Sequence, residues 1–115
     1  MITPEQVAAV KGITAIKNQI LKSDNWDEIV ELGYKALNIA APVPANNDVC
    51  PDTRYKDRSK IRQIDFMQKE LQWVKERSYP DLETVHFQIS ASLLMLSMAF
   101  VRGGISDIHE VAQLN

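Results

Sequence analysis

The sequence is poor in the residues that make tight turns, and this shortage narrows the fold class. Only four glycines and five prolines occur in 115 residues. A β-sandwich or barrel needs a turn signal every ~8–12 residues, and these signals are missing. Hydrophobic residues make up 45% and charged residues 24% of the chain, as in ordinary globular proteins, which excludes disorder over most of it. The composition therefore predicts a single all-α domain spanning residues 1–115.

Cysteine is almost absent as well. Cys50 is the only one, so neither an internal disulfide nor a thiolate metal cluster can form. The first ten residues show no basic stretch followed by an apolar one, which is the pattern typical of a secretory signal. We therefore expect a reducing, cytoplasmic location.

Apolar residues recur at helical spacing in the first part of the chain. Thr3 can cap the first helix, and Gln6 occupies the position of its capping-box partner. A second helix is expected after the break at residues 23–25, with Ser23 or Asp24 as its cap. The spacing thus predicts two helices before the first proline-rich segment.

Residues 41–53 form the one long loop that the sequence predicts, because they contain three prolines and two asparagines. A third helix is expected over about 57–78 and a fourth over about 80–102, ended by the glycine pair 103–104. Ser106 can cap a short fifth helix. The predicted fold is therefore an all-α bundle of four main helices plus a short C-terminal helix, with a Pro/Asn-rich loop between the second and third helices.

The predicted fourth helix is unusually apolar. Thirteen of the 20 residues from Leu82 to Val101 are apolar, and they surround the helix axis, which is typical of a helix buried on all sides. A membrane span is the alternative, since residues 84–101 carry no formal charge. Polar residues within the segment and the amphipathic character of the other helices argue against it. We expect neighbouring helices to cover this helix, or a homodimer or higher oligomer to share it.

No catalytic constellation is visible in the sequence. His109-Glu110 lacks the second histidine that a zinc-protease motif requires, because position 113 is glutamine. Cys50 has no identifiable base, and His86 is expected to be a hydrogen-bonded histidine rather than a metal ligand. The chain also lacks a glycine-rich phosphate loop. We therefore expect no enzymatic activity, no metal and no cofactor, and no motif assigns the chain to a known family.

Positive charge is concentrated in the middle of the chain. Residues 54–77 carry a net charge of +4. Cations at the start of a helix oppose its dipole, whereas an anion there would be favourable. The part of it from Arg54 to Arg62 is a candidate site for a nucleotide, a nucleic-acid backbone or an acidic protein patch, and a solvated basic face is the alternative. Its cations are expected to be exposed and dispensable for folding. The candidate anion-binding residues are Arg54, Tyr55, Lys56, Arg58 and Lys60.

The predicted third helix has two distinct faces when residues are placed 100° apart. One face is an ordinary apolar core stripe that consists of Ile61, Ile64, Met67, Leu71 and Val74. The other alternates cations with aromatic residues, the types that are enriched in binding hot spots. This candidate partner-binding face consists of Arg62, Phe66, Lys69, Trp73 and Arg77. Coverage by another helix of the same bundle is the alternative.

These patterns favour a small non-enzymatic protein–protein interaction protein of the inhibitor, adaptor or regulator kind. The alternative hypothesis is a nucleotide- or nucleic-acid-binding module that uses the basic segment Arg54–Arg62. Binding of the chain to a polynucleotide that weakens strongly between ~50 and ~200 mM salt would support the nucleic-acid-binding hypothesis over the protein-interaction hypothesis.

Overall fold

Four α-helices form the protein in the computed structural model, which describes residues 2–45, 60–101 and 110–111. No strand occurs in these ranges, so the predicted all-α class is confirmed. Most of the predicted loop and nearly all of the predicted fifth helix lie outside the described residues. The helices are α1 (Pro4–Lys22), α2 (Trp26–Ala40), α3 (Lys60–Lys75) and α4 (Leu82–Ser97).

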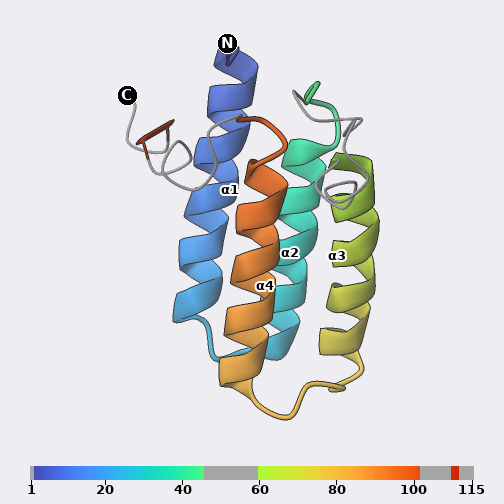
Figure 1. Cartoon of the computed structure of the whole chain (residues 1–115). Helices are drawn as coiled ribbons and strands as arrows, with labels where there is room; N and C mark the ends of the chain where they lie inside the picture. The colour runs from blue at the N-terminus through green and yellow to red at the C-terminus, as the bar shows by residue number, and fades with distance from the viewer. Residues whose placement is uncertain (1, 46–59, 102–109, 112–115) are drawn as a thin grey trace.

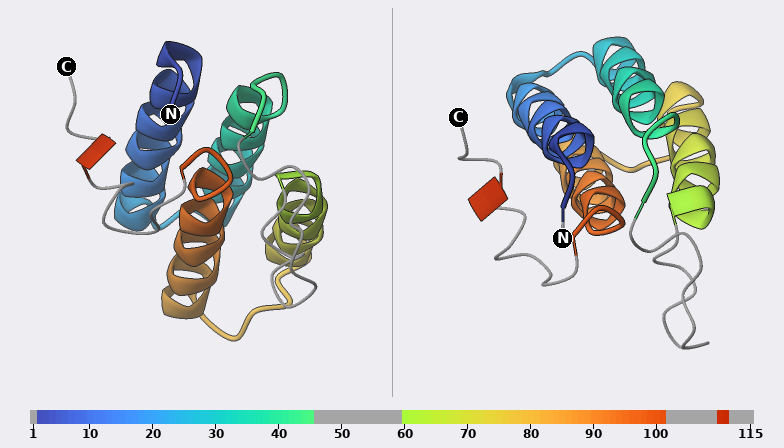
Figure 2. Two further views of the ribbon diagram at one scale, coloured as in Figure 1. Left: turned by 45° about the horizontal axis from the view of Figure 1, so that its top comes forward. Right: turned by 90° about the horizontal axis from the view of Figure 1, so that it is seen from above.

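Each helix runs antiparallel to the one before it along the chain (Figure 1). α1 and α3 each pack against both α2 and α4, and α2 also contacts α4 across the bundle. Seen from above, the four axes form a closed arrangement in which every helix keeps one side turned outward (Figure 2). This topology leaves α3 and α4 next to each other with an outer surface that both helices share.

Local capping fixes where α1 begins, as the sequence predicts. Thr3 Oγ1 accepts a hydrogen bond from the Gln6 backbone N–H at 3.1 Å, and the Thr3 N–H donates to Gln6 Oε1 at 2.9 Å. The same Gln6 side chain donates to the carbonyl oxygen of Pro44 at 2.7 Å. The capping box therefore also joins the start of α1 to the segment that follows α2.

The predicted cap of α2 was wrong. Asn25 caps this helix, because its Oδ1 accepts from the backbone N–H groups of Asp27 and Glu28 at 2.9 and 3.2 Å. Ser23 instead ends α1, and its hydroxyl oxygen accepts from the Asn25 N–H at 3.2 Å. The side chains of Ser23 and Asn25 thus both hold the turn between the two helices.

α4 is shorter than predicted at both ends. Asp81 is its cap and accepts from the Thr84 N–H at 2.7 Å, so Pro80 lies before the helix and not at its first position. The helix ends at Ser97, and a tighter turn follows in which the Phe100 N–H donates to the Ser97 carbonyl at 3.0 Å. This turn places the ring of Phe100 in the core, where it is fully buried.

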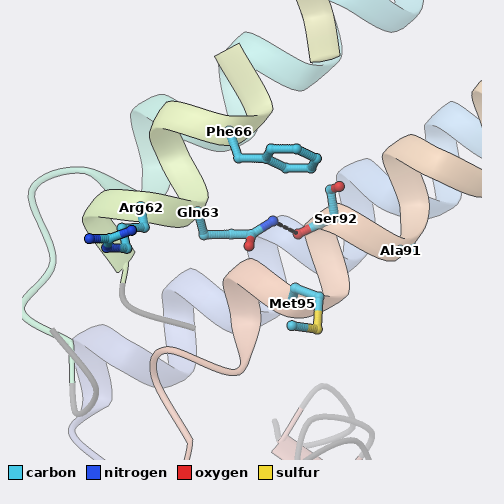
Figure 3. Close-up of a pocket in the computed structure, with 6 residues that line it drawn as sticks. All are labelled: Arg62, Gln63, Phe66, Ala91, Ser92 and Met95. Atoms are coloured by element: carbon cyan, nitrogen blue, oxygen red, sulfur yellow. Dashed lines mark hydrogen bonds between the residues drawn. The ribbon is translucent and has the colours of Figure 1, made fainter. Parts of the chain in front are cut away.

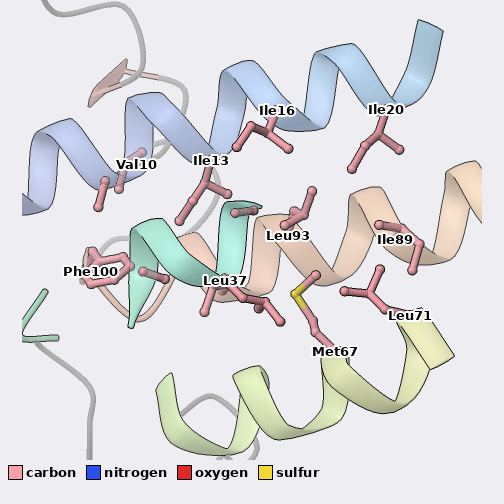
Figure 4. Packing of buried hydrophobic residues seen from close by; sticks show 14 of the residues in the cluster. Val10, Ile13, Ile16, Ile20, Leu37, Met67, Leu71, Ile89, Leu93 and Phe100 are labelled. Carbon is pink, nitrogen blue, oxygen red and sulfur yellow. The ribbon is translucent and has the colours of Figure 1, made fainter. Parts of the chain in front are cut away.

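Side chains from all four helices meet in one hydrophobic core (Figure 4). Branched aliphatic residues dominate it, and Phe100 closes one end. Burial of such side chains is the main favourable contribution to folding, about 1.5–3 kcal/mol for each. The fully buried members with the largest side chains include Ile13, Ile20, Ile29, Met67, Leu71, Ile89, Leu93, Leu96 and Phe100.

Two predictions about burial were wrong. α4 is not buried on all sides, because its outward side leaves Phe87 67% exposed and Ala91 exposed. Ile61, assigned to the core stripe of the third helix, is 68% exposed, whereas Met67 is buried as expected. A helix in a four-helix bundle packs against two adjacent helices and faces the core between them. Apolar residues on the side that faces away from the core therefore remain uncovered. No helix within the described residues has the length and apolarity needed to cross a membrane.

Gly33 on α2 lies directly against the side chain of Leu71 on α3. A Cβ atom at this position would overlap the side chain of Leu71, which is fully buried. At Gly12 the nearest atom to such a Cβ is the terminal Cδ1 of Ile39, at 3.3 Å. Glycine at position 33 is therefore required by packing, whereas glycine at position 12 is not.

We expect Gly33→Ala to lower the free energy of unfolding by about 1–3 kcal/mol, because it overpacks the contact with Leu71. Gly12→Ala is the matched control, since the gain in helix propensity of up to ~1 kcal/mol offsets a small movement of Ile39. Urea denaturation of both variants measures the difference. Equal effects of the two substitutions would contradict the close α2–α3 contact.

Candidate functional site

Lys60 is the one candidate anion-binding residue that lies within the described residues, and its side chain is engaged inside the protein. Its side chain is 9% exposed, and Nζ donates to the carbonyl oxygens of Ala41 and Val43 at 3.0 and 2.8 Å. These carbonyls follow the C-terminus of α2, where the helix dipole favours a cation. The expectation that Lys60 is exposed was therefore wrong. The other candidate anion-binding residues, Arg54, Tyr55, Lys56 and Arg58, lie outside the described residues.

The outer side of α3 carries most of the predicted partner-binding face. Phe66 and Trp73 are 46% and 42% exposed, and their rings meet edge to face with centroids 6.5 Å apart. The Lys69 ammonium lies 3.7 Å from the Asp65 carboxylate in an exposed pair. Trp73 also contacts Tyr79 edge to face at 6.5 Å. The structure thus places a row of half-exposed rings between charged side chains.

Arg77 is not part of this helical face. α3 ends at Lys75, and Arg77 adopts a left-handed backbone conformation with φ of 62°. Its guanidinium donates to the Asp27 carboxylate at 3.0 Å and to the Val74 carbonyl at 3.0 Å. It also lies over the Trp26 ring, 5.3 Å from the centroid. Arg77 therefore joins the end of α3 to the start of α2, and its predicted place on the face was wrong because the helix stops before it.

Sequence reasoning missed a row of buried polar side chains between α3 and α4. Gln63 is 6% exposed, and its Nε2 donates to the carbonyl oxygen of Ser92 at 3.2 Å. The Ser92 hydroxyl donates to the carboxyl group of Glu70, which is 1% exposed. The signal was available in the spacing, since Gln63 and Glu70 alternate with the buried apolar residues Met67 and Val74.

The environment of Glu70 changes its acidity. Burial raises the pKa of this carboxyl group from 4.5 to about 7, although the hydrogen bond from Ser92 acts in the opposite direction. Burial also raises the pKa of the Tyr79 hydroxyl to about 12, and the negative charge of Glu70 adds to that effect. The Glu70 carboxyl group therefore titrates near neutral pH, although it lies in the interior of the bundle.

A cavity of about 340 Å³ opens between α3 and α4 beside this polar row (Figure 3). Phe66, Ala91 and Met95 supply apolar walls, while Gln63 and Ser92 supply polar groups. Arg62, whose side chain is exposed, completes the lining. A mostly apolar cavity with a few polar groups and a neighbouring residue of shifted pKa is typical of a small-ligand site. We call it the α3–α4 pocket.

The described residues offer little support for other chemistry. His86 Nε2 is hydrogen-bonded to the Ser23 carbonyl oxygen at 2.7 Å, as expected for a structural histidine. Within the described ranges, no group of three His, Cys, Asp or Glu side chains could hold a metal ion. Cys50 and His109 lie outside these ranges. The chain matches no protein-family model, no curated protein and no solved structure, so its function must be inferred from its own residues.

We expect Lys60→Met to lower the free energy of unfolding by about 1.5–3 kcal/mol, because the carbonyl oxygens of Ala41 and Val43 lose a charged donor. Lys69→Met is the matched control on the same helix, where the side chain is 65% exposed. It should change stability by less than about 0.5 kcal/mol. Urea denaturation distinguishes the two. If the Lys60→Met variant is as stable as the control, the bonds from Lys60 to the two carbonyls do not stabilise the fold, and Lys60 remains a candidate anion-binding residue.

Glu70→Gln should stabilise the protein in a pH-dependent way. The folded state holds the Glu70 proton more tightly than the unfolded state, so wild-type stability falls as pH rises from 4.5 to about 7. The neutral glutamine avoids this loss. Its advantage should reach up to about 3 kcal/mol at pH 8 and shrink toward pH 5, since one pKa unit corresponds to about 1.4 kcal/mol.

Thermal or urea unfolding at pH 5 and pH 8 measures this difference. Glu76→Gln, an exposed position just after α3, is the control and should stay within about 0.5 kcal/mol of wild type at both values. A Glu70→Gln effect of the same size at pH 5 and pH 8 would show that the carboxyl group does not titrate in the interior.

Proposed function

We propose that this chain is a non-enzymatic protein–protein interaction protein, of the inhibitor, adaptor or regulator kind. Its binding surface is the outer side of α3, here called the α3 face and defined by Arg62, Phe66, Lys69 and Trp73. One observation carries the proposal. Phe66 and Trp73 remain 46% and 42% exposed although the four helices have already completed a common core.

The chemistry of the α3 face supports this proposal. Aromatic and arginine side chains supply much of the binding energy in protein interfaces. The edge-to-face contact between Phe66 and Trp73 holds both rings in place before a partner arrives, which lowers the entropy lost on binding. Arg62 and Lys69 lie beside the rings and favour a partner with acidic side chains around an apolar centre.

A second copy of the chain is one candidate partner, and we propose a homodimer or higher oligomer on this basis. Phe87 is 67% exposed on α4, and Ala91 is exposed one turn further along. Together with the α3 face they extend the apolar surface across two helices. Light scattering at micromolar concentration decides the point, since self-association gives a mass above 13.0 kDa.

The nucleotide- or nucleic-acid-binding alternative remains a hypothesis. Of the basic segment Arg54–Arg62, only residues 60–62 are described, and Lys60 is engaged with the end of α2. No described contact favours an anion there, so we place this function second. A cytoplasmic location is likewise proposed, on the support of the single cysteine in the sequence.

We expect the double variant Phe66→Ala, Trp73→Ala to stay folded and to lose its partner. Both rings are half exposed, so their truncation should cost less than the ~3–5 kcal/mol typical of fully buried aromatic residues. Circular dichroism and urea denaturation measure folding. Affinity capture from the native host, followed by mass spectrometry, measures which proteins the wild type retains and the variant does not.

The matched control is Leu21→Ala, Tyr34→Ala, which removes two similarly exposed side chains, 44% and 40%, from α1 and α2. This control should retain the same partners as the wild type. The proposal fails if the Phe66, Trp73 variant unfolds, or if it retains every partner that the control retains.

A further inference from the structure

The α3–α4 pocket contains a hydrogen-bond acceptor to which no residue in the described part of the chain donates. Gln63 is 94% buried, and its Nε2 is already used by the carbonyl oxygen of Ser92. Its Oε1 receives no hydrogen bond from any residue that the structure describes. Figure 3 shows this oxygen turned toward Met95, which also lines the pocket. Buried polar atoms are nearly always paired, so an unpaired one that faces a cavity points to a ligand.

The hydroxyl oxygen of Ser92 is a second hydrogen-bond acceptor in the pocket lining. While Glu70 is ionised, the one hydrogen of the Ser92 hydroxyl group is donated to it, so only the oxygen lone pairs remain for a further partner. The rest of the lining is apolar, apart from the cation of Arg62. Apolar walls disfavour a charged ligand of either sign, because burying an unpaired charge is costly. The complementary ligand is therefore neutral, largely apolar, and supplied with a hydrogen-bond donor.

The size and the walls of the pocket favour an aromatic ring. A cavity of roughly 150 Å³ holds benzene, and this pocket measures about 340 Å³. The ring of Phe66 can meet a second ring edge to face, and the thioether of Met95 is a favourable neighbour for an aromatic edge. One substituted ring thus fits the volume and has matching contacts.

We propose that the α3–α4 pocket binds a neutral aromatic ring that carries one hydrogen-bond donor, such as a phenol, with the donor directed at Gln63 Oε1. This chemistry has two sources, a free phenolic molecule and the side chain of a tyrosine. The residue on which this proposal depends, Gln63, is buried and does not belong to the α3 face. The proposed ligand site can therefore be tested separately from the proposed protein-binding function.

The test compares p-cresol with toluene, which has the same ring and methyl group but no donor. Each is titrated into the ¹⁵N-labelled full chain, and amide shifts of the pocket residues report binding. Gln63→Met keeps the length of the side chain and removes the acceptor. The ratio of the p-cresol affinity to the toluene affinity should fall roughly 3- to 10-fold in this variant, the range expected for one hydrogen bond.

Gln68→Met is the matched control, since Gln68 is an exposed glutamine on the same helix. It should leave the affinity ratio at the wild-type value. A second measurement uses the wild type alone and therefore does not depend on how the variant folds. In it, 4-methylanisole, which lacks the O–H donor, should bind at least roughly 3-fold more weakly than p-cresol.

N-acetyltyrosine amide distinguishes the two sources of the ring. If it shifts the pocket amides as p-cresol does, the pocket accepts a tyrosine of a protein; if only p-cresol does so, the ligand is a free small molecule. The proposal is overturned if p-cresol leaves the pocket amides unshifted, or if its preference over toluene is the same in wild type and Gln63→Met. Gln63→Met leaves the α3 face intact. Either result therefore bears on the pocket alone and leaves the proposed protein-binding function, which is tested by partner capture, unaffected.

Discussion

The inward side of α3 carries three polar side chains, and each must be paired because an unpaired buried polar group is strongly unfavourable. Lys60 reaches the carbonyls at the end of α2, whereas Gln63 and Glu70 reach Ser92 on α4. Sliding α3 by one turn would break all of these contacts at once. Hydrogen bonds of this kind fix one register, while the apolar contacts of Met67 and Leu71 supply the favourable burial.

This register decides what α3 presents to the outside. With Lys60, Gln63 and Glu70 turned inward, the positions that carry Phe66 and Trp73 are turned away from the core. The polar row and the exposed rings are therefore two consequences of the same rotation of the helix. The α3–α4 pocket lies where they meet, because Gln63 and Phe66 both line it.

Much of the fold could be predicted from the sequence, because its signals are local. The capping box of Thr3 and Gln6 depends on residues three positions apart, and the outward place of Phe66 and Trp73 follows from 100° spacing. The roles of Lys60 and Glu70 could not be predicted in this way. Their partners lie on other helices, and a charged residue on a helix is ordinarily solvated.

The errors at the ends of helices have a related cause. Arg77 occupies a left-handed position that glycine usually fills, so nothing local signalled that α3 ends before it. Its conformation is held by contacts with Trp26 and Asp27 on α2, far away in the sequence. Similarly, the apolar composition of α4 could not show which of its sides stays uncovered, because that depends on where α1 and α3 pack.

Phe66 couples the two proposed activities physically. One side of its ring contacts Trp73 on the α3 face, and the same residue forms a wall of the pocket. A ring bound in the pocket and a partner on the α3 face would both contact Phe66, so the position that one of them requires for this ring affects the binding of the other. Such coupling is reciprocal, since each ligand changes the affinity of the other by the same factor. Behind this shared side chain, Ser92 joins the pocket to Glu70, whose pKa is raised by burial.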